Sequence, residues 1–297
     1  MQNKNQTFLI VASLFCTYFI WGSTYLAIRF AIESFPTFIM VGVRFTAAGA
    51  LLYAVIRYLG SPRPTLKEWR GAGIIGLLLP VLGNGTVTHV QHTISSSVAA
   101  LAIATAPIWM AIFSSVWGHK ITAREWLGIA VGLVGIVLLN LGGSLHGNLS
   151  SALLLMFAAA SWSFGSVWSK HLAMPAGLMG AACQMLCGGV IALVLSAAVG
   201  EAWPAHISTK SWLAIIFLVF FGSMVAYSAY QWLLKNVRPL VASSNTFVNP
   251  IVAFAVGIWL ANETITSTEY VSLLVILIGV FLILSNDKTL CNDKNLE

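Results

Sequence analysis

The sequence carries very little charge for its length. Of its 297 residues, 8% are Asp, Glu, Lys or Arg and 58% are hydrophobic, whereas about a quarter of a soluble domain is charged. Too little polar material is present to cover a globular surface, so the surrounding solvent must be lipid. The net charge of +6 does not indicate nucleic-acid binding, because the basic residues form no dense patch and lie in short gaps between apolar runs.

Motifs for catalysis, metal binding and nucleotide binding are also missing. The four cysteines give no disulfide framework, since Cys16, Cys183 and Cys187 lie in apolar runs and Cys291 lies in the tail. Without His-Glu-x-x-His, Gly-x-Ser-x-Gly or a P-loop, we expect no catalytic site, no metal, no cofactor and no ATP. An intramembrane lipid-modifying enzyme would need such residues, and a non-transporting sensor or scaffold would need a further soluble domain. These two functions are kept as the alternatives.

Carboxylates are missing from the interiors of the apolar runs. Each of the nine acidic residues lies in a predicted loop, at a helix start or in the tail. Proton-driven carriers commonly use a buried Asp or Glu, so the sequence argues against carboxylate-driven antiport. A histidine, which titrates near neutral pH, could take that role instead. The sequence therefore leaves the coupling ion open.

Long apolar runs make up most of the chain. With about 20 apolar residues for each crossing, we predict an all-α, polytopic membrane protein with ten transmembrane helices. They are expected near residues 7–28, 36–57, 70–91, 97–117, 124–142, 149–169, 177–199, 211–234, 240–260 and 268–285. The first run has no small-residue cleavage pattern and is interpreted as a spanning helix, not a signal peptide.

The basic residues predict the orientation of these helices. If the N-terminus is cytoplasmic, nearly all Lys and Arg of the gaps lie inside, and only Arg29 and Lys210 lie outside. Such a bias is the usual signature of cytoplasmic loops. Both termini are therefore predicted to be cytoplasmic.

One apolar segment occurs twice. Residues 98–126, VAALAIATAPIWMAIFSSVWGHKITAREW, correspond to residues 241–270, VASSNTFVNPIVAFAVGIWLANETITSTEY. Their prolines, Pro107 and Pro250, are 143 positions apart. A proline within a helix removes a backbone hydrogen bond and favours a kink, so we interpret both as hinges, with passive bends as the alternative.

Four predicted helix starts share a capping pattern. A Ser or Thr is followed three residues later by Glu or Ser and then by an aromatic residue, as expected for a capped helix that begins at the headgroup level. The four pairs are Thr65 and Glu68, Thr122 and Glu125, Ser208 and Ser211, and Thr266 and Glu269.

The starts of the two halves correspond as well. Trp21 precedes Arg29 by eight residues, and Trp162 precedes Lys170 by the same distance. Five spans in each half is an odd number, so the second half should enter from the opposite side of the membrane. Such an inverted repeat places a binding site near the midplane. We expect a first repeat at 1–143, a second at 144–285 and a cytoplasmic tail at 286–297.

With these features the chain resembles the ten-helix EamA transporters of the drug/metabolite transporter superfamily. The resemblance covers about residues 8–285 and implies two five-helix EamA repeats around a central cavity, in the inner membrane, that move small metabolites. The chain departs from the small four-helix multidrug relatives, because its first helix has no carboxylate. The two copies also differ in charge, since one loop carries Asn262-Glu263 where the other carries His119-Lys120. We interpret this difference as a consequence of the two loops lying on opposite sides of the membrane.

Arg44 is the one charge well inside a predicted span. It lies eight residues beyond Pro36, about 12 Å at 1.5 Å per residue, so close to the middle of the membrane. A central Arg costs about 2.5–3.5 kcal/mol on insertion scales, so it should face protein or water. Two interpretations stay open: an anchor for a carboxylate or phosphate, or a structural Arg bonded to helix-end carbonyls.

Polar and aromatic side chains within the spans suggest the rest of a binding site. At helical spacing they form stripes, which can line a cavity or bond one helix to another. The sequence offers no third metal ligand beside His89 and His92, so no metal site is predicted there. The predicted substrate-binding residues are Trp21, Arg44, Asn84, Thr88, His89, Trp109, Trp162, Tyr227, Gln231, Asn245 and Asn249.

These features together predict a transporter. We expect an exporter of small metabolites, such as amino acids or related amphipathic solutes, that works by alternating access between the two repeats. Its partners would be this solute and the lipid of the inner membrane. The sequence names neither the substrate nor the direction of flux, and a monomer is compatible with it.

Overall fold

Every regular element in the described part of the chain is helical. The structure is a computed structural model that describes residues 2–118, 122–141, 149–237, 239–264 and 266–284. The repeat boundary predicted near residue 143 and the predicted tail lie outside this part. In chain order the elements are α1 (Gln2–Phe15), η1 (Cys16–Ile20), α2 (Trp21–Ala31), α3 (Thr37–Tyr58), α4 (Leu66–Gly76), η2 (Leu77–Gly85), α5 (Thr86–Val90), α6 (Ser96–Ile103), α7 (Ala106–Val116), α8 (Ala123–Leu141), α9 (Leu149–Trp168), η3 (Ser169–His171), α10 (Leu178–Ala198), α11 (Thr209–Phe217), η4 (Leu218–Val225), α12 (Ala226–Asn236), α13 (Pro239–Ala242), α14 (Asn245–Ala261) and α15 (Ser267–Leu284).

The described residues contain seven helical stretches that are long and apolar enough to cross a membrane. Three further apolar helices, within residues 126–135, 248–261 and 267–279, are shorter. Large apolar side chains such as Phe8, Phe157 and Phe281 are exposed on the surface of the bundle. In water such a surface would be an extensive apolar patch, so it is the surface that contacts lipid.

Three of the predicted helix caps are formed. Thr65 Oγ1 accepts from Glu68 N at 3.3 Å, and the Glu68 carboxylate accepts from Thr65 N at 2.7 Å. The caps that begin at Ser208 and at Thr266 have the same first bond, at 3.1 and 3.3 Å. The side chain of Glu125, in the fourth predicted cap, lies outside the described residues.

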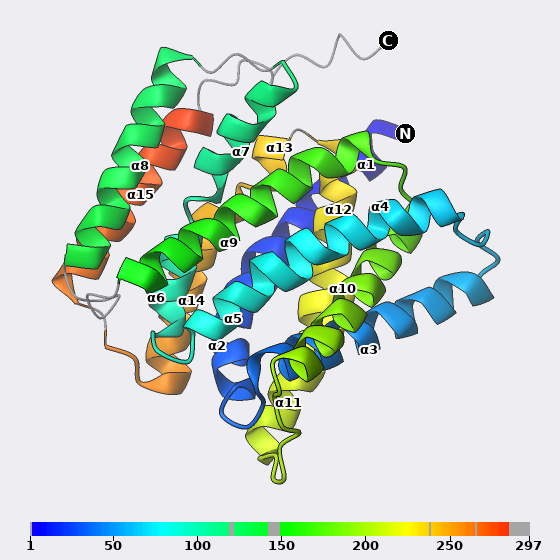
Figure 1. Cartoon of the computed structure of the whole chain (residues 1–297). Coiled ribbons are helices and arrows are strands. Elements are labelled where there is room, and N and C mark those ends of the chain that lie inside the picture. The colour runs from blue at the N-terminus through cyan, green and yellow to red at the C-terminus, as the bar shows by residue number, and fades with distance from the viewer. Residues whose placement is uncertain (1, 119–121, 142–148, 238, 265, 285–297) are drawn as a thin grey trace.

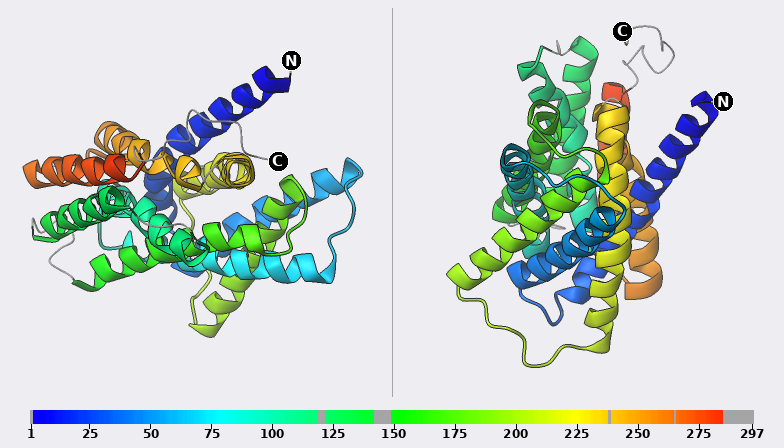
Figure 2. Two further views of the ribbon diagram at one scale, coloured as in Figure 1. Left: turned by 90° about the horizontal axis from the view of Figure 1, so that it is seen from above. Right: turned by 90° about the vertical axis from the view of Figure 1, so that its right-hand side faces the viewer.

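Helices at equivalent places in the two halves pack against each other. The second predicted span, α3, lies along the seventh, α10, and the fifth, α8, lies along the tenth, α15. These two pairs form opposite ends of the bundle (Figures 1 and 2). Close approach depends on glycine, because a Cβ added at Gly49 would lie 2.5 Å from Leu186 N and one at Gly189 would lie 2.3 Å from Thr46 N. The halves are therefore joined by backbone contacts that admit no side chain.

Several spans are not continuous α-helices. The segments η1, η2 and η4 are π-helical, and η2 and η4 begin at Leu77 and Leu218, 141 positions apart. In η2 the cause is Pro80, whose ring cannot donate to the preceding turn and crowds its carbonyl. Such wide turns are common at functional sites, since they leave backbone groups unpaired within the helix.

The two predicted hinges lie in different settings. The fourth span is broken between α6 and α7, and Pro107 lies in the first turn of α7, where a missing N–H costs nothing. Pro250 lies inside α14. The ninth span is broken ahead of it, between α13 and α14. The break at residues 104–105 precedes Pro107, and the break at residues 243–244 precedes Pro250 by several residues. The role of the two prolines as hinges stays a prediction.

Candidate functional site

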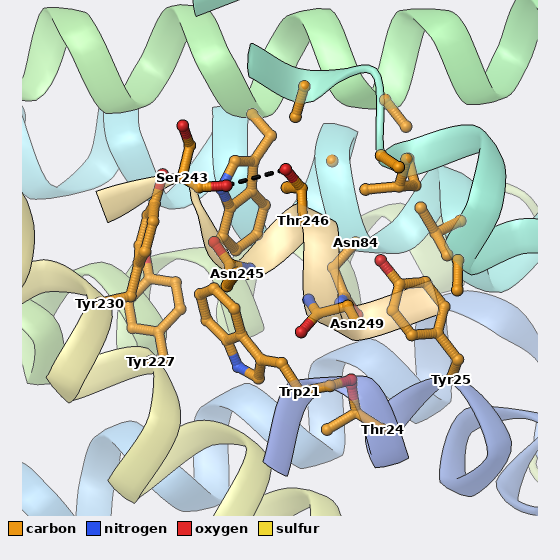
Figure 3. Close-up of a pocket in the computed structure, with 18 of the residues that line it drawn as sticks. Trp21, Thr24, Tyr25, Asn84, Tyr227, Tyr230, Ser243, Asn245, Thr246 and Asn249 are labelled. Carbon is orange, nitrogen blue, oxygen red and sulfur yellow. Dashed lines mark hydrogen bonds between the residues drawn. The ribbon is translucent and has the colours of Figure 1, made fainter. Parts of the chain in front are cut away.

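A cavity lies between the two halves of the chain, where the interrupted helices meet (Figure 3). Its volume of about 80 Å³ is enough for several water molecules or for one small solute. Its walls come from α2, α3, η2, α5, α6, α7, α9, α12 and α14 and from the residues that join α6 to α7 and α13 to α14. The lining residues are Trp21, Thr24, Tyr25, Ile28, Arg44, Phe45, Gly83, Asn84, Val87, Ala100, Ile103, Ala104, Ala106, Met110, Ala158, Trp162, Tyr227, Tyr230, Ser243, Asn245, Thr246 and Asn249.

Aromatic rings form one wall of the cavity. The Trp21 ring meets Trp162 edge to face with centroids 5.4 Å apart, and Tyr230 lies 5.0 Å from Trp21. Trp162 also meets Tyr227 edge to face at 6.1 Å. Trp21 is fixed by a hydrogen bond of 2.9 Å from its Nε1 to Gly222 O in η4. This wall is largely aromatic, and it joins residues from both halves.

Arg44 supplies the positive charge of the cavity. Its side chain is buried, its Nε donates to Ser223 Oγ at 2.9 Å, and its Nη1 donates to Asn84 Oδ1 at 3.2 Å. The guanidinium carbon lies 4.6 Å from the centre of the Phe45 ring. No ion pair to Arg44 is found among the described residues. The guanidinium is therefore oriented by neutral groups, and its remaining N–H donors are left for a ligand.

Two amides from the first turns of α14, Asn245 and Asn249, line the cavity beside Trp21 (Figure 3). With amide orientations assigned from the hydrogen-bond network, Asn249 Nδ2 donates to Tyr18 O at 2.9 Å. In this orientation Asn249 Oδ1 accepts from Asn245 Nδ2 at 3.0 Å. Thr246 Oγ1 donates to Ser243 O at 2.8 Å across the break between α13 and α14. The break in the ninth span thus presents polar groups to the cavity.

The structure brings together part of the predicted set. Seven residues line the cavity: Trp21, Arg44, Asn84, Trp162, Tyr227, Asn245 and Asn249. Four do not. Thr88 is buried and bonds back to Asn84 O at 2.8 Å, and His89 is exposed in the last turn of α5. Trp109 packs on Phe113, and Gln231 lines a different pocket. Substrate binding by the cavity residues stays a prediction.

Several residues in and around the cavity were not among those predicted from the sequence. Thr24 and Tyr25 follow Trp21 at helical spacing, so the same periodicity could have found them. Tyr230 shares a helix face with Tyr227 and bonds Ser166 Oγ at 2.9 Å. Ser223, which orients Arg44, had no such signal, because it lies in an apolar run that is π-helical.

The lining favours binding over covalent chemistry. The residues that line the cavity in the described part of the chain include no Asp, Glu, His or Cys. Among the described residues there is also no group of three or more possible metal ligands. One cation, amides, hydroxyls and aromatic rings can hold an amphipathic solute with a negatively charged group.

A second polar network lies at one end of the bundle, around Glu263. The Glu263 side chain is 4% exposed and pairs with Arg29. Its carboxylate also accepts from Ser96 N at 3.1 Å, from Ser96 Oγ at 2.7 Å and from Ser97 N at 3.3 Å, at the start of α6. The sequence interpretation of Glu263 as a marker of sidedness was incomplete, since this residue joins the second half of the chain to the first.

This network predicts a change of stability with pH. Burial alone would raise the pKa of the Glu263 carboxyl, but hydrogen bonds from Ser97 and Ser96 and the charge of Arg29 outweigh it and lower that pKa below its ordinary value. A lowered pKa stabilises the folded state above the ordinary pKa, and this contribution is lost as the pH falls through the lowered one. We expect the melting temperature in detergent to fall as the pH drops below about 4.

The variant Glu263→Gln should be less stable at pH 7, by about 2 kcal/mol, and should lose the part of the acid transition that belongs to this carboxylate. A matched control is Glu33→Gln, because Glu33 forms an ion pair with Lys210 in which both side chains are about half exposed. That variant should retain the acid transition. An unchanged acid transition in Glu263→Gln would contradict the assignment.

Known proteins share this sequence and fold. The EamA-like transporter family matches at residues 8–141 and again at residues 149–285. The inner membrane transporter YedA of Escherichia coli is 42% identical over 92% of this chain and 90% of its own length. The transporter YoaV of Bacillus subtilis is 24% identical over 89% of this chain and 92% of its own. A solved crystal structure at 19% identity has the same fold, with a TM-score of 0.67. The match covers 94% of this chain and 97% of the chain in that structure.

The relatives are named as transporters, not enzymes, which agrees with a cavity suited to binding. The family match spans almost the whole chain, and the apolar surface of the bundle is one that lipid must cover. The chain belongs to the EamA-like transporter family and is a multi-pass membrane transporter.

Proposed function

We propose that this transporter exports small amphipathic solutes that carry a carboxylate, such as amino acids with an apolar side chain. The observation that carries the proposal is the position of Arg44, a buried cation without an acidic partner among the described residues, on a cavity walled by Trp21 and Trp162. A buried charge is costly unless a partner of opposite charge is present for part of the time. A bound carboxylate is such a partner.

The opposite wall is suited to the rest of an amino acid. An apolar or aromatic side chain can pack against Trp21, Trp162 and Tyr230, where ring pairs add about 0.5–1.5 kcal/mol beyond area burial. The amides Asn245 and Asn249 can accept hydrogen bonds from an amino group. The cavity volume favours one small solute at a time.

The proposed architecture is ten spans in two inverted repeats. It is supported by the seven long and three shorter apolar helices and by the pairing of α3 with α10 and of α8 with α15. It is also supported by the starts of η2 and η4, which are 141 positions apart, the same spacing that separates Trp21 from Trp162. A two-fold relation between the halves brings equivalent helices together in this way. With the positive-inside rule, both termini are cytoplasmic and the Glu263 network lies on the outer side.

The proposed mechanism is alternating access. The cavity lies between the halves, so a rocking motion of one half against the other would open it to either side. The Glu263 network joins the halves at the outer end, and its opening would release solute outward. The direction of flux rests on the family resemblance and stays part of the proposal.

Counterflow in proteoliposomes tests the function. Vesicles loaded with an unlabelled amphipathic amino acid should take up the labelled one with saturable kinetics, and vesicles without protein should not. A panel of amino acids, nucleosides and cationic drugs defines the class, and we expect carboxylate-bearing solutes to compete best. Exchange of cationic drugs alone would contradict the substrate class, and no exchange across the panel would contradict the function.

A further inference from the structure

A second pocket lies at the end of the bundle that the basic residues mark as cytoplasmic. Its volume is about 380 Å³, and it is separate from the central cavity. Its walls come from η3 and the segment after it, and from α10 and α12. The lining residues are Ser169, Lys170, Leu172, Met174, Gln184, Gln231, Leu234 and Lys235.

The charged groups of this pocket are both positive. Lys235 Nζ donates to Pro175 O at 3.2 Å, which fixes the end of α12 against the segment that precedes α10. Lys170 has no hydrogen bond or ion pair within the described part of the chain. No carboxylate is among the lining residues. Two cations thus share one pocket without an anion from the described residues.

One of the residues that line the pocket has an unused hydrogen-bond donor. Gln231 is 5% exposed, and its Nε2 has no hydrogen-bond partner among the described residues. Its Oε1 accepts from Gln184 Nε2 at 3.4 Å, and Gln184 Oε1 accepts from Tyr227 Oη at 2.7 Å. A buried amide donor without a partner costs about 1–3 kcal/mol, so a ligand that accepts from it would be stabilised.

The Arg29–Glu263 pair at the outer end of the bundle shows which kind of partner Lys170 lacks. Lys170 follows Arg29 by 141 positions, the same spacing that separates Trp162 from Trp21. Arg29 pairs with Glu263. The sequence position that corresponds to Glu263 in the other half is Lys120, another cation. Lys170 at the inner end therefore has no carboxylate at the position that corresponds to Glu263, which is the partner of Arg29 at the outer end. The acceptor for Lys170 must come from another source.

We infer that Lys170, Lys235 and Gln231 form a second, inner binding site for an oxyanion, a carboxylate or a phosphate group. Two ammonium groups and an amide N–H present donors only, and oxyanions accept several such bonds. The oxyanion can belong to a free solute or to the headgroup of an anionic lipid, which the cytoplasmic leaflet supplies. The Tyr227–Gln184–Gln231 chain connects this site to the central cavity, because Tyr227 lines that cavity.

Binding to the full chain in neutral detergent tests the first source without any transport assay. Inorganic phosphate or acetate, added at constant ionic strength with chloride, should raise the melting temperature saturably by about 2–4 °C. Lys170→Gln and Lys235→Gln should each weaken the apparent affinity about tenfold. Adding Gln231→Leu to either variant should weaken the affinity further. The control Lys67→Gln removes an exposed cation of α4 outside the pocket and should leave the shift unchanged.

Nanodiscs test the second source. If phosphate and acetate give no saturable shift, discs with phosphatidylglycerol should stabilise the wild type over discs with phosphatidylcholine, and the double variant Lys170→Gln/Lys235→Gln should lose this difference. Either result with that dependence on the lysines supports the site and names its source. Shifts that are equal in wild type and the double variant, in both experiments, overturn it. Neither outcome depends on the central cavity, so a failure here is distinct from a failure of the proposed transport.

Discussion

Replacing Arg44 by Gln is expected to reduce the transport of carboxylate-bearing solutes by about 10–100-fold in kcat/KM. The Arg44 guanidinium is the positive charge of the cavity, and its orientation is set by Ser223 and Asn84. A hydrogen bond to a charged group contributes about 1.5–3 kcal/mol, and each 1.4 kcal/mol is about a factor of ten. Gln keeps a donor of similar shape but removes the charge that a carboxylate needs.

Initial rates of counterflow with wild type and variant at equal reconstituted protein provide the measurement. Arg44→Lys keeps the charge without the planar fork of donors, so it should recover part of the loss. The control Arg57→Gln removes an arginine from the far end of the same helix, where its side chain donates to Ser61 O. That variant should transport at the wild-type rate.

Two results would exclude Arg44 from the substrate site. One is unchanged kinetics in Arg44→Gln. The other is a loss that is equal for a carboxylate-bearing solute and for its uncharged amide, since a merely structural arginine would affect both alike.

Replacing Gly189 by Ala is expected to separate α3 from α10 and to destabilise the whole bundle. The added Cβ would lie 2.3 Å from Thr46 N and 2.4 Å from Thr46 Oγ1, and a backbone atom cannot move without its helix. Overpacking typically costs about 1–3 kcal/mol, and this contact involves backbone, so we expect about 3 kcal/mol for Ala. Val at the same position should abolish the folded protein.

Size-exclusion profiles and melting temperatures in detergent measure this effect. The matched control is Gly73→Ala in α4, where a Cβ meets no atom within 4 Å. Ala favours a helix over Gly by about 1 kcal/mol, so this variant should be slightly more stable than wild type. The two glycines should therefore give effects of opposite sign, and wild-type stability in Gly189→Ala would contradict the close packing of α3 on α10.

The class of fold could be predicted because its signals are local. Apolar runs, the caps that begin at Thr65, Ser208 and Thr266, and the spacing of Trp21 and Trp162 can all be seen in short stretches of sequence. Lipid requires each span to satisfy its own backbone groups, so hydrophobicity alone indicates where helices lie. The helical class and the membrane setting agree with the structure for this reason.

The site was predictable only in part, because its remaining contacts are not local. Asn84 and Thr88 lie on one predicted stripe, yet only Asn84 reaches the cavity, whereas Thr88 is buried away from it and bonds back to Asn84 O. The wide turns of η2 and η4 have no α-helical periodicity that would identify Ser223. Glu263 bonds residues more than 160 positions away, and no pattern within its own loop indicates those partners.

The tryptophans of the aromatic wall provide an intrinsic spectroscopic probe of the cavity. Trp21 and Trp162 belong to different halves, and their indoles are close enough, at 5.4 Å, for their excited states to couple. Near-ultraviolet circular dichroism and fluorescence lifetimes are sensitive to such coupling. Any motion that parts the halves would separate the two chromophores, so opening of the cavity can be followed in real time without an attached label.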